Sequence, residues 1–211
     1  MLYFFLKVYY MVYSNLSQIH YIYNEDKQKA RRRAKKLGWE INSKLSNNDV
    51  ITFMKDNAVH INYAGTNITN PRDIISDVML ATGKKSADFT TRKRRTRDIM
   101  RQLGDDKEYT VSGHSLGGSI GLSILQESKS IRDRVKEGHF YNPGLTAPFT
   151  KALTPANKQV KAELNDKVTI HRVKGDIVSE GKTPSFGKVI EYEPPKGAGL
   201  LEAHKLDTFG E

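Results

Sequence analysis

One short stretch of the chain has the residue types and spacing of an activated nucleophile. Gly113, Ser115 and Gly117 fit the pattern G-x-S-x-G. In this pattern a strand turns sharply into a helix and lifts the serine hydroxyl above the sheet. Glycine suits both flanking positions because a β-carbon there would crowd the neighbouring strand and helix. We therefore predict that Ser115 is a nucleophile.

The residues around the motif predict the strand and the helix that it needs. Glu108 to Ser112 is typical of a strand, and Leu116 to Gln126 has apolar residues at helical spacing. The amino end of such a helix points free N–H groups at a developing negative charge. This context makes the motif more specific than the bare pattern.

A serine hydroxyl needs a base to take its proton, so the hypothesis requires a histidine and a carboxylate. In proteins with this strand–turn–helix motif the acid follows the serine, and the histidine follows the acid. Asp176 lies in the turn after a strand predicted over Val168 to Val173, and His204 is the only histidine beyond it. We predict Asp176 as the acid and His204 as the base. A plain turn carboxylate and an exposed tail histidine are the alternatives.

The other histidines are interpreted as structural, because they precede the predicted acid along the chain. They are His20, His60, His114, His139 and His171. His171 lies within the strand that leads to Asp176, where a packed side chain is expected.

The remaining apolar patterns predict a sheet covered by helices. Val50 to Met54 and Ala58 to Ala64 are short apolar runs joined by turn residues, as in a hairpin. Further helices are predicted over Asn24 to Leu37, Ile74 to Met79, Thr91 to Leu103 and Asn157 to Leu164, and further strands over His139 to Tyr141, Val168 to Val173 and Val189 to Tyr192. Because strands alternate with helices, we predict the α/β class, with a mostly parallel central sheet flanked by helices.

The length of 211 residues and the lack of a linker rich in Pro, Gly and Ser favour one domain. We predict that residues 24–211 form it. Residues 1–23 are apolar and aromatic, and the sequence leaves their order open. Lys7 interrupts the apolar stretch, which is too short to span a bilayer, and no basic start or small-residue cleavage site marks a signal peptide.

The net charge of +10 predicts attraction to anionic partners. The run from Arg92 to Arg97 favours peripheral contact with an anionic membrane surface, with a solvated helix face as the alternative. Arg31 to Arg33 fits a solvated face better. We expect no nucleic acid partner, since neither a recognised motif nor a platform of aromatic residues accompanies the charge.

The chain has no cysteine, which excludes disulfides and cysteine-ligated metals. We predict neither a metal nor a cofactor. Gly181-Lys182-Thr183 is not a phosphate-binding loop, because the position of its first glycine holds Asp176. Compartment and oligomeric state are left open, although frequent Lys, Asn, Ile and Tyr suit an AT-rich genome such as that of a large virus.

Four segments resemble the class 3 lipases, also called fungal-type lipases, of the α/β-hydrolase superfamily. Val111 to Gly118 is similar to the nucleophile block of the family, and Val173 to Val178 is similar to its acid block. Tyr141 to Gly144 resembles the end of the strand after the nucleophile helix, and Ile61 to Thr66 resembles the turn that contributes to the oxyanion hole.

The resemblance implies an α/β-hydrolase fold and hydrolysis of a carboxylic ester, with a lipid ester as the expected substrate. By this likeness Thr66 and the backbone N–H of Leu116 would stabilise the oxyanion. Pro71 to Leu80 stands in the place of the family's lid, and its apolar residues equally suit a core. Ala64 stands where the family usually has arginine, and the stretch from Asp176 to His204 is shorter than in the family.

Other functions fit the same sequence. Acyl transfer or peptide hydrolysis is an alternative within this fold, because an acyl-enzyme step does not identify the final acceptor. A protein that kept the fold without activity, for example a virion component, is an alternative of a different class. Labelling of Ser115 by a fluorophosphonate would distinguish an active site from a vestigial one.

Overall fold

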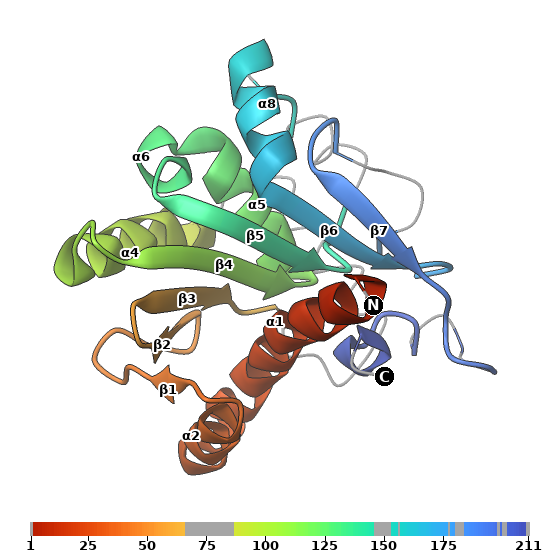
Figure 1. Ribbon diagram of the computed structural model, residues 1–211, viewed down its shortest axis with the longest axis horizontal. Helices are drawn as coiled ribbons and strands as arrows, with labels where there is room; N and C mark the ends of the chain where they lie inside the picture. The colour runs from red at the N-terminus through yellow and green to blue at the C-terminus, as the bar shows by residue number, and fades with distance from the viewer. Residues whose placement is uncertain are drawn as a thin grey trace.

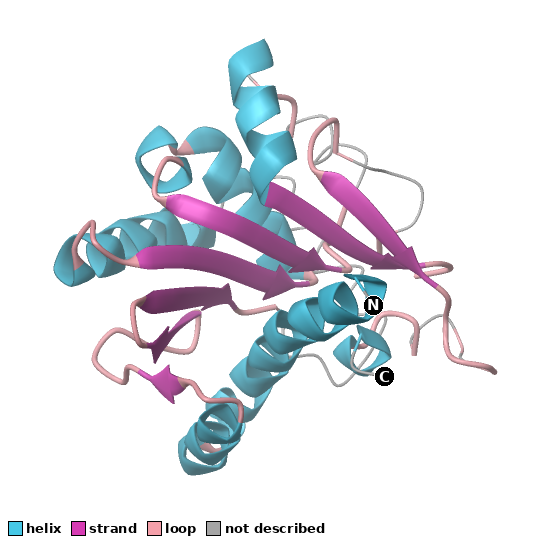
Figure 2. Ribbon diagram, in the orientation of Figure 1, coloured by secondary structure: helices cyan, strands magenta, loops and turns pink. Residues whose placement is uncertain are grey.

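The structure is a computed structural model that describes residues 2–65, 87–145, 153–155, 157–176, 178–179, 184–197, 199 and 202–209. In these ranges seven strands form one sheet, whose spatial order is the order of the strands along the chain. Helices lie against both faces of this sheet (Figures 1 and 2).

The strands are β1 (Glu40–Ile41), β2 (Val50–Lys55), β3 (Ala58–Tyr63), β4 (Glu108–His114), β5 (Val135–Tyr141), β6 (Val168–Val173) and β7 (Lys188–Tyr192). The first three pair antiparallel, and β3 to β7 all pair parallel. The predicted hairpin is β2–β3, with Asp56 at a positive φ of 50° in its turn. The prediction of a mostly parallel sheet flanked by helices is thus confirmed. Only β1 was missed, because a strand of two residues has no readable pattern.

The described helices are α1 (Leu2–Glu25), α2 (Lys27–Lys36), α4 (Ala87–Leu103), α5 (Leu116–Glu127), α6 (Lys129–Arg132), α8 (Lys158–Lys167) and the 3₁₀ helix η1 (Leu206–Phe209). The prediction that a helix starts at Asn24 was wrong, since Asn24 belongs to α1. Asp26 instead caps α2, and its carboxylate accepts hydrogen bonds from two backbone N–H groups at 2.9 Å. The helix predicted over Ile74 to Met79 lies outside the described residues.

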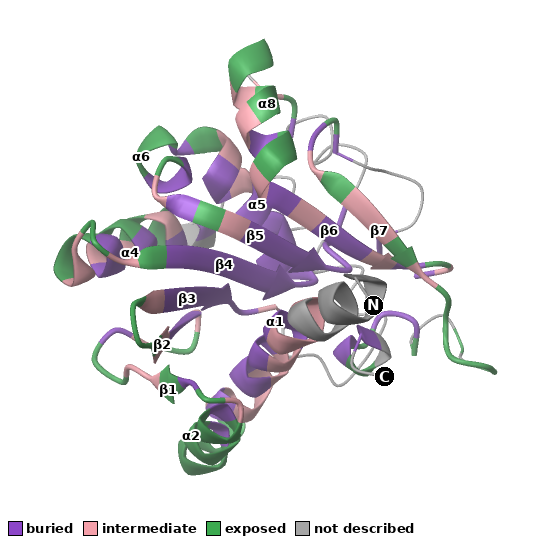
Figure 3. Cartoon of the chain, viewed as in Figure 1, coloured by how far each residue is buried: buried purple, intermediate pink, exposed green. Residues whose placement is uncertain are grey.

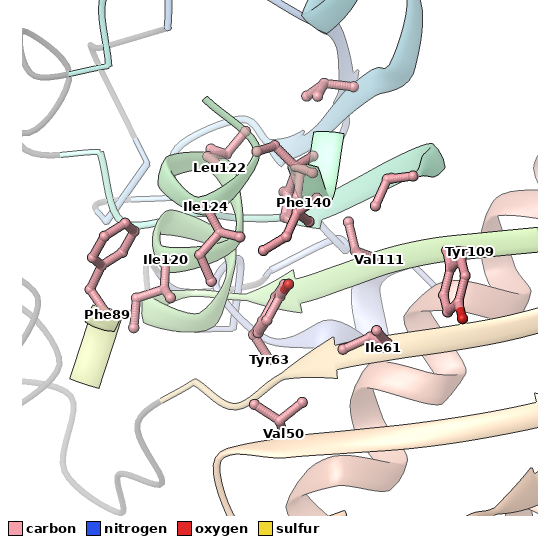
Figure 4. Packing of buried hydrophobic residues seen from close by; sticks show 14 of the residues in the cluster. Val50, Ile61, Tyr63, Phe89, Tyr109, Val111, Ile120, Leu122, Ile124 and Phe140 are labelled. Atoms are coloured by element: carbon pink, nitrogen blue, oxygen red, sulfur yellow. The ribbon is translucent and has the colours of Figure 1, made fainter. Parts of the chain in front are cut away.

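One face of the sheet is apolar and packs against α4, α5 and α8. Alternate residues of the central strands point to this face, and Figure 3 shows β3, β4 and β5 largely buried. Figure 4 shows Ile61, Val111 and Phe140 of these strands beside Ile120 and Ile124 of α5. This packing fixes α5, and with it the turn that connects α5 to β4.

The opposite face of the same strands is polar, yet it is buried because α1 covers it. The polar residues there are His60, Asn62, Thr110, Ser112, His114, His139 and His171. From α1, the ring of Tyr13 stacks on His139 with centroids 4.5 Å apart and planes 9° apart. The segment whose order the sequence left open is therefore a helix over the central strands (Figure 1).

Hydrogen bonds satisfy this buried polar layer. Ser17 of α1 donates to Asn62 Oδ1 at 2.7 Å. The two ring nitrogens of His60 lie 2.8 Å from the hydroxyls of Thr110 and Ser112. A buried polar group left without such partners would cost about 1–3 kcal/mol. The polar side chains of α1 and of the strands thus supply hydrogen-bond partners to each other inside the protein.

Among the helices in the described part of the chain, none has the length and apolar character needed to cross a membrane.

The buried histidines predict a loss of stability in mild acid. Burial lowers the pKa of His20 to about 4 and of His60 to about 3, below the ordinary 6.5, and it holds the pKa of His171 well below that value. As the pH falls below about 6.5, these histidines therefore bind protons in the unfolded chain but stay neutral in the folded chain. Each such histidine removes about 1.4 kcal/mol of stability per pH unit below about pH 6.

Denaturant unfolding at a series of pH values checks this expectation. The free energy of unfolding should be flat near neutral pH and fall below about pH 6. His60→Gln, which cannot titrate, should show a shallower fall whatever its stability at neutral pH. An identical slope in the variant would contradict the assignment of His60 as a buried neutral group.

Candidate active site

Ser115 stands in a strained turn between β4 and α5. Its φ of 54° and ψ of −124° lie in a region that costs a non-glycine residue about 1–3 kcal/mol. Its N–H donates to the carbonyl of Tyr141 at 3.0 Å, and its own carbonyl accepts from the N–H groups of Ser119 and Gly144 at 3.1 and 3.2 Å. Contacts from α5 and from the end of β5 thus hold the strained backbone in place.

The two glycines of the motif let the backbones come together at this turn. A β-carbon on Gly113 would lie 2.5 Å from the carbonyl carbon of Gly117. A β-carbon on Gly117 would lie 2.6 Å from the carbonyl oxygen of Ala64, and closer still to that of Tyr63. The structure therefore supports the steric reason on which the prediction of this turn rests.

The structure brings together the three side chains selected from the sequence. Ser115 Oγ lies 2.9 Å from His204 Nε2, and His204 Nδ1 lies 2.9 Å from Asp176 Oδ1. Ser115 and His204 are each 3% exposed, and Asp176 is fully buried. An ionised carboxylate only accepts hydrogen bonds, so Nδ1 carries the proton of a neutral imidazole. The lone pair on Nε2 then accepts the hydroxyl proton of Ser115.

Several donors keep Asp176 ionised inside the protein. Burial alone would raise the pKa of Asp176, but hydrogen bonds from His204, from the Ser179 hydroxyl at 2.6 Å and from the Val178 N–H at 3.1 Å lower it below the ordinary 3.8. The carboxylate is therefore charged at neutral pH and can orient His204. Ser179 was not predicted, and the sequence around it carries no signal for this role.

Asn142 connects the loops that carry the acid and the histidine. Its side chain donates to the carbonyl of Ala203 at 2.9 Å and accepts from the N–H of Val173 at 2.9 Å. Its φ of 39° turns the backbone sharply at the end of β5. The sequence marks Tyr141 to Gly144 as a strand end but carries no signal for this role of Asn142.

His114, interpreted from the sequence as structural, lies beside the site and bonds to the backbone of His204. Its Nε2 donates to the backbone carbonyl of His204 at 2.7 Å, and its Nδ1 lies 2.7 Å from the hydroxyl of Tyr21. Its position directly before Ser115 was the available signal.

Helix α5 begins at Leu116. The N–H groups in the first turn of a helix have no carbonyl partner within the helix, so they are free to bind a negative charge. Thr66, expected as the second oxyanion donor, lies outside the described residues, and so does Pro71 to Leu80, for which the sequence left a lid or a part of the core open. The chain does approach the turn just before Thr66, since a β-carbon on Gly65 would lie 2.7 Å from the His114 carbonyl oxygen.

An arginine side chain lies beside Ala64, the position at which the lipases that the sequence resembles usually have arginine. The buried guanidinium of Arg92, from α4, donates to the carbonyl of Ala64 at 2.5 Å. This arginine ties α4 to the end of β3. Within the described ranges no group of three or more His, Asp or Glu side chains is placed to hold a metal ion.

At the level of sequence, no protein-family model and no curated protein matches the chain.

Comparison of structures places the fold among lipases. A lipase from Rhizopus microsporus var. chinensis superposes with a TM-score of 0.53 and 16% identity over 87% of this chain and 72% of that one. The Rhizomucor miehei lipase in its native propeptide complex superposes with a TM-score of 0.50 and 14% identity, over 92% and 68% of the two chains. The prediction of an α/β-hydrolase fold similar to fungal lipases is confirmed. At these identities the likeness concerns the fold.

The contacts at Gly117 predict that this position cannot accept a side chain. Gly117→Ala should lower the free energy of unfolding by at least about 2 kcal/mol, because two backbone carbonyls obstruct the added methyl group. Gly199→Ala is the control, since among the described residues its β-carbon would meet the flexible end of the Glu202 side chain, at 3.3 Å, and no backbone atom. Chemical denaturation measures both variants, and a Gly117→Ala protein as stable as the control would refute the crowding.

Proposed function

We propose that the chain is a carboxylic-ester hydrolase that acts through an acyl-enzyme intermediate on Ser115. The observation that carries the proposal is the continuous hydrogen-bonded chain from Ser115 through His204 to Asp176, with both links at 2.9 Å. The strained turn presents the hydroxyl, and the buried carboxylate fixes the histidine. These parts match the roles of nucleophile, base and orienting acid in serine hydrolases.

The proton movements follow from the tautomer of His204. Ser115 Oγ attacks the acyl carbon while its proton moves to His204 Nε2, and the resulting imidazolium is stabilised by Asp176. The same proton then passes to the oxygen of the leaving alcohol. Water attacks the acyl-enzyme in the second half, again with His204 as base, and releases the acid and the free serine.

The oxyanion forms on the substrate beside Ser115, which directly precedes the first residue of α5. We assign the N–H of Leu116 as one donor, because the positive end of the helix dipole favours negative charge there. The role of Thr66 as the second donor, which the resemblance to class 3 lipases implies, stays a prediction. Removing one donor of this kind typically costs a factor of about 10²–10³ in rate.

A lipid ester is the substrate class that we propose, because the two solved structures described above as similar in fold are lipases. Acyl transfer to another acceptor would use the same first half-reaction. A non-catalytic role in the same fold fits less well, because it gives no reason to maintain a strained serine and a buried carboxylate on one histidine.

Ester hydrolysis tests the proposal directly. Ser115→Ala should reduce hydrolysis of a p-nitrophenyl ester by at least about ten-thousand-fold while the protein stays folded, because only the nucleophilic oxygen is lost. Ser123→Ala, the same change farther along α5, should keep the activity. Equal turnover by the wild-type and Ser115→Ala proteins would end the hydrolase proposal.

The position of the basic residues changes the proposal of membrane contact. In the run from Arg92 to Arg97, Arg92 is buried and Lys93 forms an ion pair with Glu127 at 3.4 Å. Helix α2, by contrast, exposes seven cations and has no acidic residue: Lys27, Lys29, Arg31, Arg32, Arg33, Lys35 and Lys36. Like charges one turn apart destabilise a helix. We therefore assign the proposed contact with an anionic bilayer to α2.

Binding to vesicles distinguishes this surface from the overall charge. Replacing Arg32, Lys35 and Lys36 by Gln should weaken binding to vesicles with anionic phospholipid about a hundredfold at low salt, since each cation contributes a factor of about five. The control replaces the exposed Lys158, Lys161 and Lys196 by Gln. Equal weakening in both proteins would mean that net charge, and not α2, attracts the membrane.

A further inference from the structure

The segment that carries His204 is held mainly by side chains from elsewhere in the fold. Among its described residues, 199 and 202–209, the backbone–backbone hydrogen bonds are local, such as the bond from the Ala203 N–H to the Gly199 carbonyl at 3.2 Å. Two consecutive carbonyls of the segment bind outside groups: Ala203 accepts from Asn142 at 2.9 Å, and His204 accepts from His114 at 2.7 Å. The second bond acts on the residue that must face Ser115.

The direction of each hydrogen bond at His114 follows from its partners. A backbone carbonyl only accepts, so His114 Nε2 carries the proton of the ring. Burial, together with the nearby His204, lowers the pKa of His114 to about 3, so the ring is neutral near pH 7. Its Nδ1 is then an acceptor, and the Tyr21 hydroxyl donates to it at 2.7 Å. The two hydrogen bonds therefore run in one direction: Tyr21 donates to His114, and His114 donates to the carbonyl of His204.

Helix α1 reaches the His204 segment in two places. One contact is indirect, through the bond of Tyr21 to His114, and the other is direct, since Gln18 donates to Asp207 at 2.9 Å, three residues beyond His204. Gly65 makes room for Tyr21, because a β-carbon at position 65 would collide with the tyrosine hydroxyl. Figure 1 shows the C-terminal segment beside α1. The N-terminal helix thus contacts the segment that positions the base.

We propose that Tyr21 and His114 are positioning residues for His204, and that α1 sets the geometry of the active site through them. The proposal rests on the proposed hydrolase function. The rings of His114 and His204 lie 4.8 Å apart, so a neutral His114 supports the backbone without placing a second charge beside the imidazolium. The side-chain hydrogen bonds described for Tyr21 and His114 join them to each other and to the His204 backbone, not to Ser115 Oγ.

The rate of labelling by a fluorophosphonate tests the proposal, since it reports activation of Ser115 without a known substrate. Tyr21→Phe removes one hydroxyl and should slow labelling about tenfold, and His114→Leu should slow it at least as much. His114→Gln offers one donor and one acceptor without a charge, and it should recover most of the rate that Leu loses. Tyr23→Phe, the same change on the same helix, should label at the wild-type rate.

The endpoint of labelling separates positioning from folding. A positioning role predicts a slower rate with a full endpoint in Tyr21→Phe. A lower endpoint with an unchanged rate per folded molecule would mean that these residues only stabilise the fold, and it would overturn the proposal. Wild-type rates in both Tyr21→Phe and His114→Leu would overturn it while leaving the hydrolase function intact. A wild-type protein that does not label would refute both.

Discussion

The strained backbone of Ser115 is the constraint on which the rest of the structure depends. An L-amino acid at a φ of 54° persists only if its surroundings compensate for the strain. Glycines at 113 and 117 let β3, β4 and α5 approach closely enough to do so, and the carbonyl of Tyr141 extends the pairing of β4 with β5 by one bond. The apolar packing between α5 and the sheet supplies the stability that holds this turn.

The arrangement at Ser115 also requires that His204, which lies 89 residues farther along the chain, be held beside the serine hydroxyl. The end of β6 places Asp176, and Asn142 joins this strand end to the His204 segment. From the other side, α1 covers a polar face of the sheet and supports the same segment through His114. The buried polar layer under α1 is therefore continuous with the site, so the first and last parts of the chain act on the same residue.

The sequence predicts the parts of this account that arise from local pattern. The G-x-S-x-G motif, the strand and helix around it and the chain order of acid and base lead to Ser115, Asp176 and His204, which the structure brings together. The sequence could not predict that α1 covers the histidine-bearing face, because polar residues alternating with apolar ones usually indicate a face open to water. The sequence also does not reveal Tyr21 and Asn142, because their contacts join segments far apart in the chain. Nor does it reveal Ser179, whose contact with Asp176 lies in a turn without a recognisable pattern.

The most direct test of the account is the location of a covalent adduct after reaction with a fluorophosphonate. Peptide mass spectrometry should find the phosphonyl group on Ser115, and the adduct should be nearly absent from a His204→Ala protein because the hydroxyl then lacks its base. No adduct in a folded protein, or an adduct spread over other serines and unaffected by His204→Ala, would contradict the claim that His204 and Asp176 activate Ser115.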